Sequence, residues 1–241
     1  LYVHEMFPFW RAFFTELGYR VVLSDVTNKE LIRKGVENVV SETCFPIKVS
    51  HGHVLNVLEK GVKRIFLPSV VNLKASHPEI PNSSACPYAQ SFPYAIPSSI
   101  DFKKNDVKLL QPILHFGYGK GYLEKELVKF GKSLHRGSKR VKKAFEKAER
   151  FQALFYQSLL NRGKEILNQV DPNNKVMVIV GRPYNSCDSG VNLEIPKKLR
   201  DLGVLPIPMD FLPLESVAPS EEIREMYWRY GQRILAAGKI I

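Results

Sequence analysis

Residues 175–185 read KVMVIVGRPYN, and this stretch decides the predicted fold. The apolar run 175–180 lies between polar turns, which is typical of a strand buried on both faces of a parallel sheet. Arg182, Tyr184 and Asn185 follow the strand, at the end where ligands bind in open α/β sheets. The Arg182 guanidinium and backbone N–H groups there can hold an anion, so these three are candidate cofactor-binding residues. A well-packed turn is the alternative interpretation.

Outward from this strand, helical and strand patterns alternate. Ser138 begins the longest periodic stretch, which predicts a helix of about 30 residues. The alternation on both sides of that helix predicts an α/β protein of two doubly wound, mainly parallel lobes. Residues 1–135 are the expected first lobe, 136–170 the connecting helix and 171–241 a truncated second lobe. The patterns predict further strands at 19–23, 62–67, 107–114 and 204–208, and further helices at 9–17, 27–34, 47–60, 122–130 and 220–237.

The composition is that of a packed globular protein. Of the 241 residues, 44% are hydrophobic and 11% aromatic, which excludes disorder as the main state. No apolar run approaches the roughly 18 residues of a membrane span, and we expect a cytoplasmic protein with no membrane partner. The abrupt first and last residues suggest a part of a longer chain.

The net charge of +11 favours acidic partners. Its densest run, residues 132–147, predicts a solvated helix face, with a phosphate-binding groove as the sharper alternative. No nucleic-acid recognition motif accompanies the charge, so nucleic acid is not an expected partner. GYGKGY at 117–122 lacks the spacing of a phosphate-binding loop and is typical of a flexible turn.

Three cysteines, Cys44, Cys86 and Cys187, lie in the turn-forming contexts SETCFPIK, SSACPYAQ and RPYNSCDSG. An odd, widely spread set is a poor disulfide framework and fits a reducing compartment. Thiolates are ligands for iron–sulfur clusters and zinc. The lack of a CxxC pair disfavours a zinc site, because structural zinc sites usually take ligands from such local pairs. Three ordinary free thiols remain the alternative. His51 and His53 are two residues apart on a helix and cannot form a helical metal pair.

The block from LYVHEMFPFWRAFF through SETCFPIK to IFLPSV, together with ACPYAQ, GRPYN and NLEIPKKLRDLG, resembles a known family. It is similar to a domain of 2-hydroxyacyl-CoA dehydratase activator-related proteins, itself similar to 2-hydroxyglutaryl-CoA dehydratase subunits and double-cubane-cluster reductases. The resemblance covers nearly the whole chain. It implies two flavodoxin-like (Rossmann-like) lobes with an iron–sulfur cluster in the cleft between them.

The resemblance also implies the metal ligands. Cys44 and Cys86 match two cluster-binding loops of the first lobe, and Cys187 stands where a third ligand from the second lobe is expected. The implied cofactor is a [4Fe-4S] cluster with one iron open. Cys187 is the weaker match, and a residue beyond Ile241 is the other candidate.

We therefore expect an iron–sulfur protein of anaerobic metabolism that takes part in ATP-driven, low-potential electron transfer for reductive dehydration of a CoA thioester. The resemblance implies an ATP-binding activator domain or protein as partner and an acyl-CoA as substrate. Whether the chain is itself a component of a lyase or reductase stays open. The alternative is a non-catalytic electron-relay or docking module that couples an ATPase activator to a partner enzyme.

Overall fold

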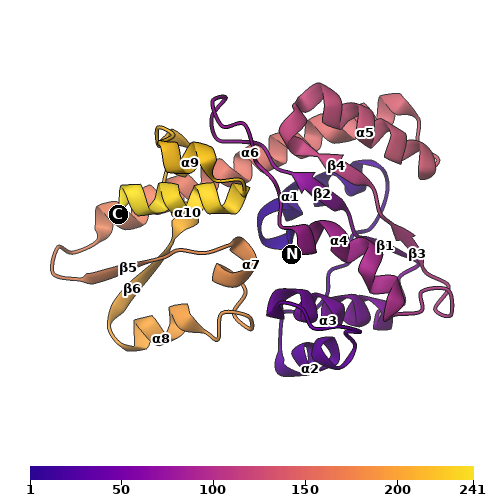
Figure 1. The fold of residues 1–241 in the computed structure, drawn as a ribbon, viewed down its shortest axis with the longest axis horizontal. Helices are drawn as coiled ribbons and strands as arrows, with labels where there is room; N and C mark the ends of the chain where they lie inside the picture. The colour runs from indigo at the N-terminus through magenta and orange to yellow at the C-terminus, as the bar shows by residue number, and fades with distance from the viewer.

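Helices and short parallel strands alternate along all 241 residues of the chain, described in a computed structural model. Figure 1 shows the elements of the first 135 residues on one side and β5 to α10 on the other, with α6 running behind. The helices are α1 (Val3–Glu16), α2 (Lys29–Glu37), α3 (Phe45–Glu59), α4 (Pro87–Ala95), α5 (Lys120–Ser133), α6 (Ser138–Gln169), α7 (Pro183–Ser186), α8 (Ile195–Asp201), α9 (Glu221–Glu225) and α10 (Arg229–Ile240). The strands are β1 (Arg64–Phe66), β2 (Ser69–Asn72), β3 (Lys108–Leu110), β4 (Ile113–His115), β5 (Lys175–Ile179) and β6 (Val204–Pro208), and 3-10 turns lie at Ile96–Ser98, Phe116–Tyr118, Met209–Phe211 and Leu214–Ser216.

All three strand pairs are parallel: β1 with β3, β2 with β4, and β5 with β6. The first two pairs continue one another, because Leu67 donates to the Leu110 carbonyl and Ser69 to the Pro112 carbonyl, both at 2.9 Å. Pro68 and Pro112 interrupt the ladder because proline has no N–H to donate. Residues 64–72 and 108–115 thus run side by side as one interrupted pair.

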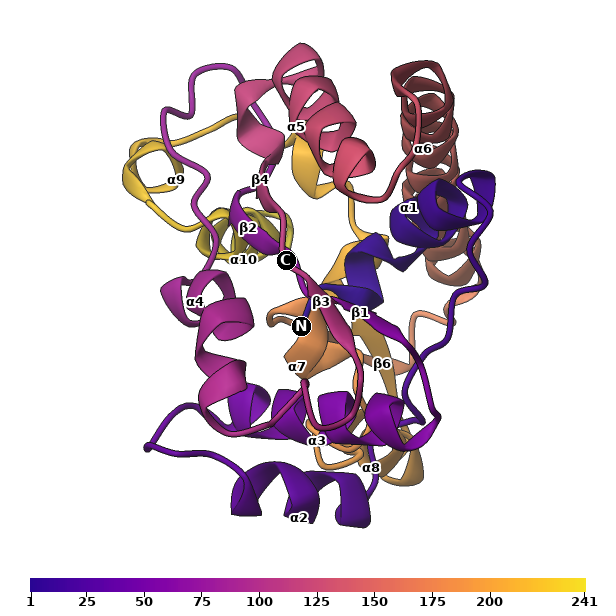
Figure 2. The same ribbon diagram turned by 90° about the vertical axis from the view of Figure 1, so that its right-hand side faces the viewer.

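An aromatic core fixes α1 between α6 and the first strands. Phe13 of α1 and Phe145 of α6 are fully buried in it. Trp10 packs on Phe66 of β1 with ring centroids 4.5 Å apart. Figure 2 shows α1 beside α6, with α2 and α3 stacked at the opposite end of the molecule. The first residues of the chain therefore lie near β1, at the edge of that strand that does not pair with β3.

The helices α2 and α3 pack through glycines. A Cβ on Gly35 would lie 2.2 Å from the Lys48 carbonyl oxygen, and one on Gly52 would lie 2.0 Å from that of Leu31. The N-cap of α2 is Asn28, whose side chain accepts from the Leu31 N–H at 3.0 Å. Thr27, the predicted first residue of this helix, lies two residues before Lys29 and one before the N-cap, because the Thr27 side chain bonds to Asp188 and His53 instead.

Two strand predictions are wrong in detail. Residues 19–23 carry a strand pattern but form no strand, because no neighbouring backbone pairs with them. The strand β5 forms where expected, yet its first three residues are exposed. Burial on both faces needs neighbouring strands and covering helices, whereas β5 pairs with β6 alone.

The fold class α/β is compatible with this arrangement, since helices alternate with parallel strands. Each sheet has two strands. Two flavodoxin-like lobes joined by the long helix stay a prediction. None of the helices combines the length and the apolar composition that a membrane span requires.

Candidate functional site

Cys44 and Cys86 occupy equivalent positions at the starts of two helices. Cys44 is the N-cap of α3 and Cys86 the N-cap of α4, and a proline in the first turn follows each. Neither side chain caps its helix by a hydrogen bond. The first N–H groups of a helix lack intrahelical partners and favour negative charge. Both sulfurs therefore sit where a thiolate or a bound anion is stabilised.

Arg182 and Tyr184 lie beside these cysteines. The Arg182 guanidinium donates to the Tyr184 hydroxyl at 2.8 Å, and Tyr184 is buried. Burial raises the pKa of Tyr184, Arg182 opposes that rise, and the charges of Cys86 and Cys44 add to it. Burial acts to lower the pKa of Arg182, but Tyr184 and the adjacent Cys86 raise it overall. One arginine–tyrosine pair therefore lies within electrostatic reach of both thiols.

Two buried hydroxyls at this place lack hydrogen-bond partners. They are the Oη of Tyr2 and the Oγ1 of Thr43, the residue before Cys44. Burial raises the pKa of Tyr2, and the charge of Cys86 raises it further. A buried donor without an acceptor is costly unless a further group satisfies it. Both hydroxyls are therefore free to donate to an acceptor atom of a bound group.

Cys187 has a different set of neighbours. It is exposed at the C-terminal end of α7, and its N–H donates to the Pro183 carbonyl. Partial burial raises the pKa of its thiol, the Ser186 hydroxyl 3.6 Å from the sulfur opposes this rise, and the charges of Asp210, Arg233 and Glu5 have smaller effects. No group of three or more His, Cys, Asp or Glu side chains is arranged to hold a metal ion. The structure thus brings Cys44 and Cys86 toward one tyrosine without bringing Cys187 to them.

Asn185, the third candidate cofactor-binding residue, is exposed.

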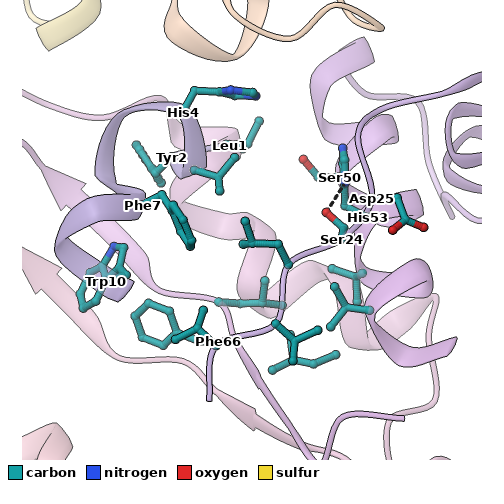
Figure 3. A pocket seen from close by; sticks show the side chains of 18 of the residues that line it. Leu1, Tyr2, His4, Phe7, Trp10, Ser24, Asp25, Ser50, His53 and Phe66 are labelled. Atoms are coloured by element: carbon teal, nitrogen blue, oxygen red, sulfur yellow. Dashed lines mark hydrogen bonds between the residues drawn. The ribbon is translucent and has the colours of Figure 1, made fainter. Parts of the chain in front are cut away.

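A large apolar cavity of about 1170 Å³ lies between α1, α3 and β1. Figure 3 shows Trp10 and Phe7 of α1 on one side of it and the pair Ser24–His53 on the other. Tyr184 and Cys187 also line it. The cavity and the cysteine region therefore meet at α7.

A hydrogen-bonded relay lines the cavity on the side of α3. Thr27 Oγ1 donates to Asp188 Oδ2 at 2.5 Å and lies 3.0 Å from Nε2 of His53, while Ser24 Oγ lies 2.7 Å from Nδ1. Because Thr27 has one proton and gives it to Asp188, its oxygen accepts from Nε2–H, and Nδ1 accepts from Ser24. His4 Nε2 also lies 3.5 Å from the Asp188 carboxylate. The relay joins residues 161 positions apart in sequence.

Sequence reasoning missed this relay. The spacing of His51 and His53 excludes only a helical metal pair, and no motif marks Ser24, Thr27 or Asp188 as site residues. A signal was present, because Thr27 and Asp188 are polar residues in loops beside predicted strand ends. Their separation in sequence gave no reason to pair them.

The relay predicts that stability rises with pH between about 4 and 6.5. Burial is the main reason that the pKa of His53 falls from 6.5 to about 4. In that window the unfolded chain binds a proton that folded His53 does not, so acid favours unfolding, by about 2 kcal/mol after allowance for solvent screening. Urea unfolding across the window should show this slope, and His53→Gln should flatten it. The exposed His135→Gln variant should keep the wild-type slope, and an unchanged slope in His53→Gln would refute the assignment.

A family model described as "CoA enzyme activase uncharacterised domain (DUF2229)" matches residues 1–212. The match includes Cys44, Cys86, Cys187 and the relay. Neither the comparison with curated proteins nor that with solved structures found a match.

Proposed function

The chain belongs to the family of the CoA enzyme activase domain, and on that premise we propose that it holds an iron–sulfur cluster through Cys44 and Cys86. The family points to a role in activating CoA-dependent enzymes. We propose that this role is low-potential electron transfer to an enzyme that dehydrates a 2-hydroxyacyl-CoA, fed by an ATP-binding activator domain or protein.

One observation carries the proposal: two uncapped helix N-termini each present a cysteine beside the same tyrosine. Thiolates are the usual ligands of iron–sulfur clusters, and helix N-termini and Arg182 offset negative charge there. The unpartnered hydroxyls of Tyr2 and Thr43 supply donors of the kind that bond to cluster sulfur. The residues present therefore suit an iron–sulfur cluster and account for two of its cysteine ligands.

The third cysteine ligand is the open part of the proposal. Cys187 follows α7, which carries Tyr184, so a modest movement of this short helix would bring it closer. A residue outside residues 1–241 is the other source. In either case the proposed cluster is of the [4Fe-4S] type.

When bound, the cluster would supply one-electron chemistry at low potential. The residues of this chain have separate parts. Cys44 and Cys86 bind, Arg182 offsets charge, and Tyr184 holds Arg182 in place by the 2.8 Å hydrogen bond. Tyr184 is buried, whereas Cys44 is exposed and Cys86 is half-buried, so one side of the bound group would face solvent.

A second candidate function is a docking module without a cluster, which couples an ATPase activator to a CoA-dependent enzyme. It is favoured by the absence of a grouped set of three or more metal-binding side chains. The surplus of positive charge suits an acidic partner surface. This candidate predicts binding of the partner with unchanged affinity after Cys44→Ala and Cys86→Ala.

Anaerobic reconstitution with iron and sulfide separates the two functions. The cluster proposal predicts a broad sulfur-to-iron absorption band and a paramagnetic signal after reduction. Both should be lost in Cys44→Ala and in Cys86→Ala, because each removes a ligand. The Cys187→Ala variant identifies the third ligand: loss assigns it to Cys187, and retention assigns it elsewhere. If wild-type protein shows no absorption band but still binds its partner, the cluster proposal is refuted and the docking module is supported.

A further inference from the structure

The turn between α5 and α6 packs against the end of α1 and carries a concentration of positive charge (Figure 2). Six cationic side chains of this turn and of the helices that it joins form the basic face: Lys132, Arg136, Lys139, Arg140, Lys143 and Lys147. The carboxylate of Glu16 lies 3.0 Å from Nζ of Lys143 and 2.9 Å from Nζ of Lys147. Hydrogen bonds from Lys147 and Lys143 lower the pKa of Glu16 to about 2, so Glu16 stays ionised. One carboxylate thus faces six cations.

Two arginines of the basic face are held in place by the backbone of α1. Arg136 donates from Nε to the Leu17 carbonyl at 3.0 Å, and Arg140 donates from Nε to the Glu16 carbonyl at 3.2 Å. The Arg136 guanidinium also lies over the Tyr19 ring, 5.0 Å from its centroid. Stabilisation of the C-terminal carbonyls of α1 explains these Nε bonds but uses none of the terminal Nη groups. Both arginines therefore present oriented Nη donors, which match the geometry of a carboxylate.

The side of α6 that faces α5 differs from the basic face, because its charges are paired within the chain. There Lys142 pairs with Glu124 at 2.8 Å, and Lys120 pairs with Glu149 at 2.5 Å. On the basic face only Lys143 and Lys147 pair with a carboxylate, and they share the same one. The side toward α5 needs no further acid, whereas the basic face suits one supplied by another molecule.

The surroundings of the basic face favour a protein ligand over a membrane or a nucleic acid. Residues 123–150 include no exposed large apolar side chain, so the face lacks the groups that a membrane-surface helix inserts into lipid. Single-stranded nucleic acids stack bases on aromatic rings, but Arg136 already lies over Tyr19. Glu16 lies among the cations and would repel a continuous run of phosphates. Separate carboxylates avoid it by binding on either side.

We propose that the basic face docks an acidic helix on the surface of a partner protein, with carboxylate side chains one helical turn apart. Arg136 and Arg140 are four residues apart in sequence, as are Lys139 and Lys143. Four residues of helix rise about 6 Å, so the cations of α6 recur at the same interval as acidic residues at positions i and i+4 of a partner helix. The two arginines bind carboxylates through Nη, and the lysines add charge.

The basic face lies away from the two cysteines of the proposed cluster site. Tyr2, on which the charge of Cys86 acts, precedes the first residue of α1, and Leu17 follows the last. The 14 residues of α1 span about 20 Å. A partner docked on the basic face therefore leaves the cysteine region uncovered. The inference adds a docking surface to the proposed function and does not depend on the cluster.

Fluorescence anisotropy of a labelled peptide tests the basic face on residues 1–241. The probe is an alanine-based helical peptide with glutamate at every fourth position. The double variant Lys132→Glu with Lys139→Glu breaks no ion pair of the chain, and it should weaken binding at least about tenfold, because two attractions become repulsions. Lys103→Glu with Lys104→Glu changes the net charge equally at an exposed loop and should weaken binding less than about twofold. Equal weakening by the two double variants would overturn the proposal.

A second peptide of the same composition, with its glutamates spread around the helix, tests whether the face reads spacing. The proposal expects weaker binding of this peptide, and equal affinity for both peptides would contradict it, as would no binding of the first. The double variant Arg136→Lys with Arg140→Lys keeps the charge but loses the Nη forks, so it should lose part of the preference for the first peptide.

Two further arms separate the ligand classes and the two proposals. Tighter binding of single-stranded DNA or of phosphatidylserine vesicles than of the first peptide, lost in Lys132→Glu with Lys139→Glu, would overturn the protein assignment. The Cys44→Ala variant should bind the first peptide as wild type does. That result would support the basic face even if reconstitution showed no cluster, so failure of one proposal is distinguishable from failure of the other.

Discussion

The Arg233→Ala variant is expected to lose about 3–5 kcal/mol of unfolding free energy, because it leaves buried carboxylates without their positively charged partner. The Arg233 side chain is 8% exposed, and its Nη2 lies 2.8 Å from Oδ1 of Asp210. Its Nη1 lies 3.6 Å from Oε1 of Glu5. The same carboxylate accepts from the Tyr156 hydroxyl at Oε1 and from the Tyr230 hydroxyl at Oε2. These side chains come from α1, α6, α10 and the turn after β6, so the loss should affect the whole protein.

The control for this prediction is Arg224→Ala. Arg224 and Glu79 form a 3.7 Å pair with side chains 44% and 62% exposed. An exposed pair contributes at most about 1 kcal/mol. Urea denaturation should separate the two variants clearly. Adding Asp210→Asn to Arg233→Ala should restore part of the stability, since it neutralises one stranded carboxylate. Equal losses in Arg233→Ala and Arg224→Ala would show that the buried network does not stabilise the fold.

Gly52→Ala should cost about 2–4 kcal/mol and detach α2 from α3. The added Cβ would lie 2.0 Å from the Leu31 carbonyl oxygen, a backbone atom that cannot turn aside as a side chain does. Gly35→Ala should act in the same way, since its Cβ meets the Lys48 carbonyl at 2.2 Å. Because Cys44 lies in the connection between α2 and α3, both variants should also retain less iron after reconstitution.

Gly121→Ala is expected to raise the stability of the protein, in contrast to Gly52→Ala. Gly121 lies in α5 with open space around its Cβ position. Alanine there should stabilise the protein by about 0.5–1 kcal/mol, because it favours the helix and meets no obstacle. Chemical denaturation gives the stability of each variant, and proteolysis at residues 38–43 reports whether α2 has detached. Similar stability of Gly52→Ala and wild type would mean that the two helices are not in close contact.

Local patterns predicted those elements that local sequence controls. The periodic apolar stripe that begins at Ser138 predicted the start of α6. The expected helix at 220–237 is broken, however, because Ser84 pairs with Tyr227 and Arg229 through the backbone. That pairing joins positions more than a hundred residues apart, and no local pattern reports it. Tertiary contact overrides helix propensity there.

The candidate site was predictable only in part. The turn contexts indicated Cys44 and Cys86 as candidates, and the strand-end position indicated Arg182 and Tyr184. That one tyrosine lies within reach of both thiols depends on the contact of α7 with α1, which sequence periodicity does not encode. Assignment of Cys44, Cys86 and Cys187 to one cluster remains a prediction, and the neighbours of Cys187 make it the ligand most in need of a test.

The central claim is that Cys44 and Cys86 bind an iron–sulfur cluster. The most direct test is the iron and acid-labile sulfide content of protein purified without oxygen, measured for wild type, Cys44→Ala, Cys86→Ala and Cys187→Ala. The account predicts about four irons and four sulfides per wild-type chain, as a [4Fe-4S] cluster requires, with loss in both Cys44→Ala and Cys86→Ala. Wild-type protein without iron, or iron content unaffected by replacing Cys44 and Cys86, would contradict it.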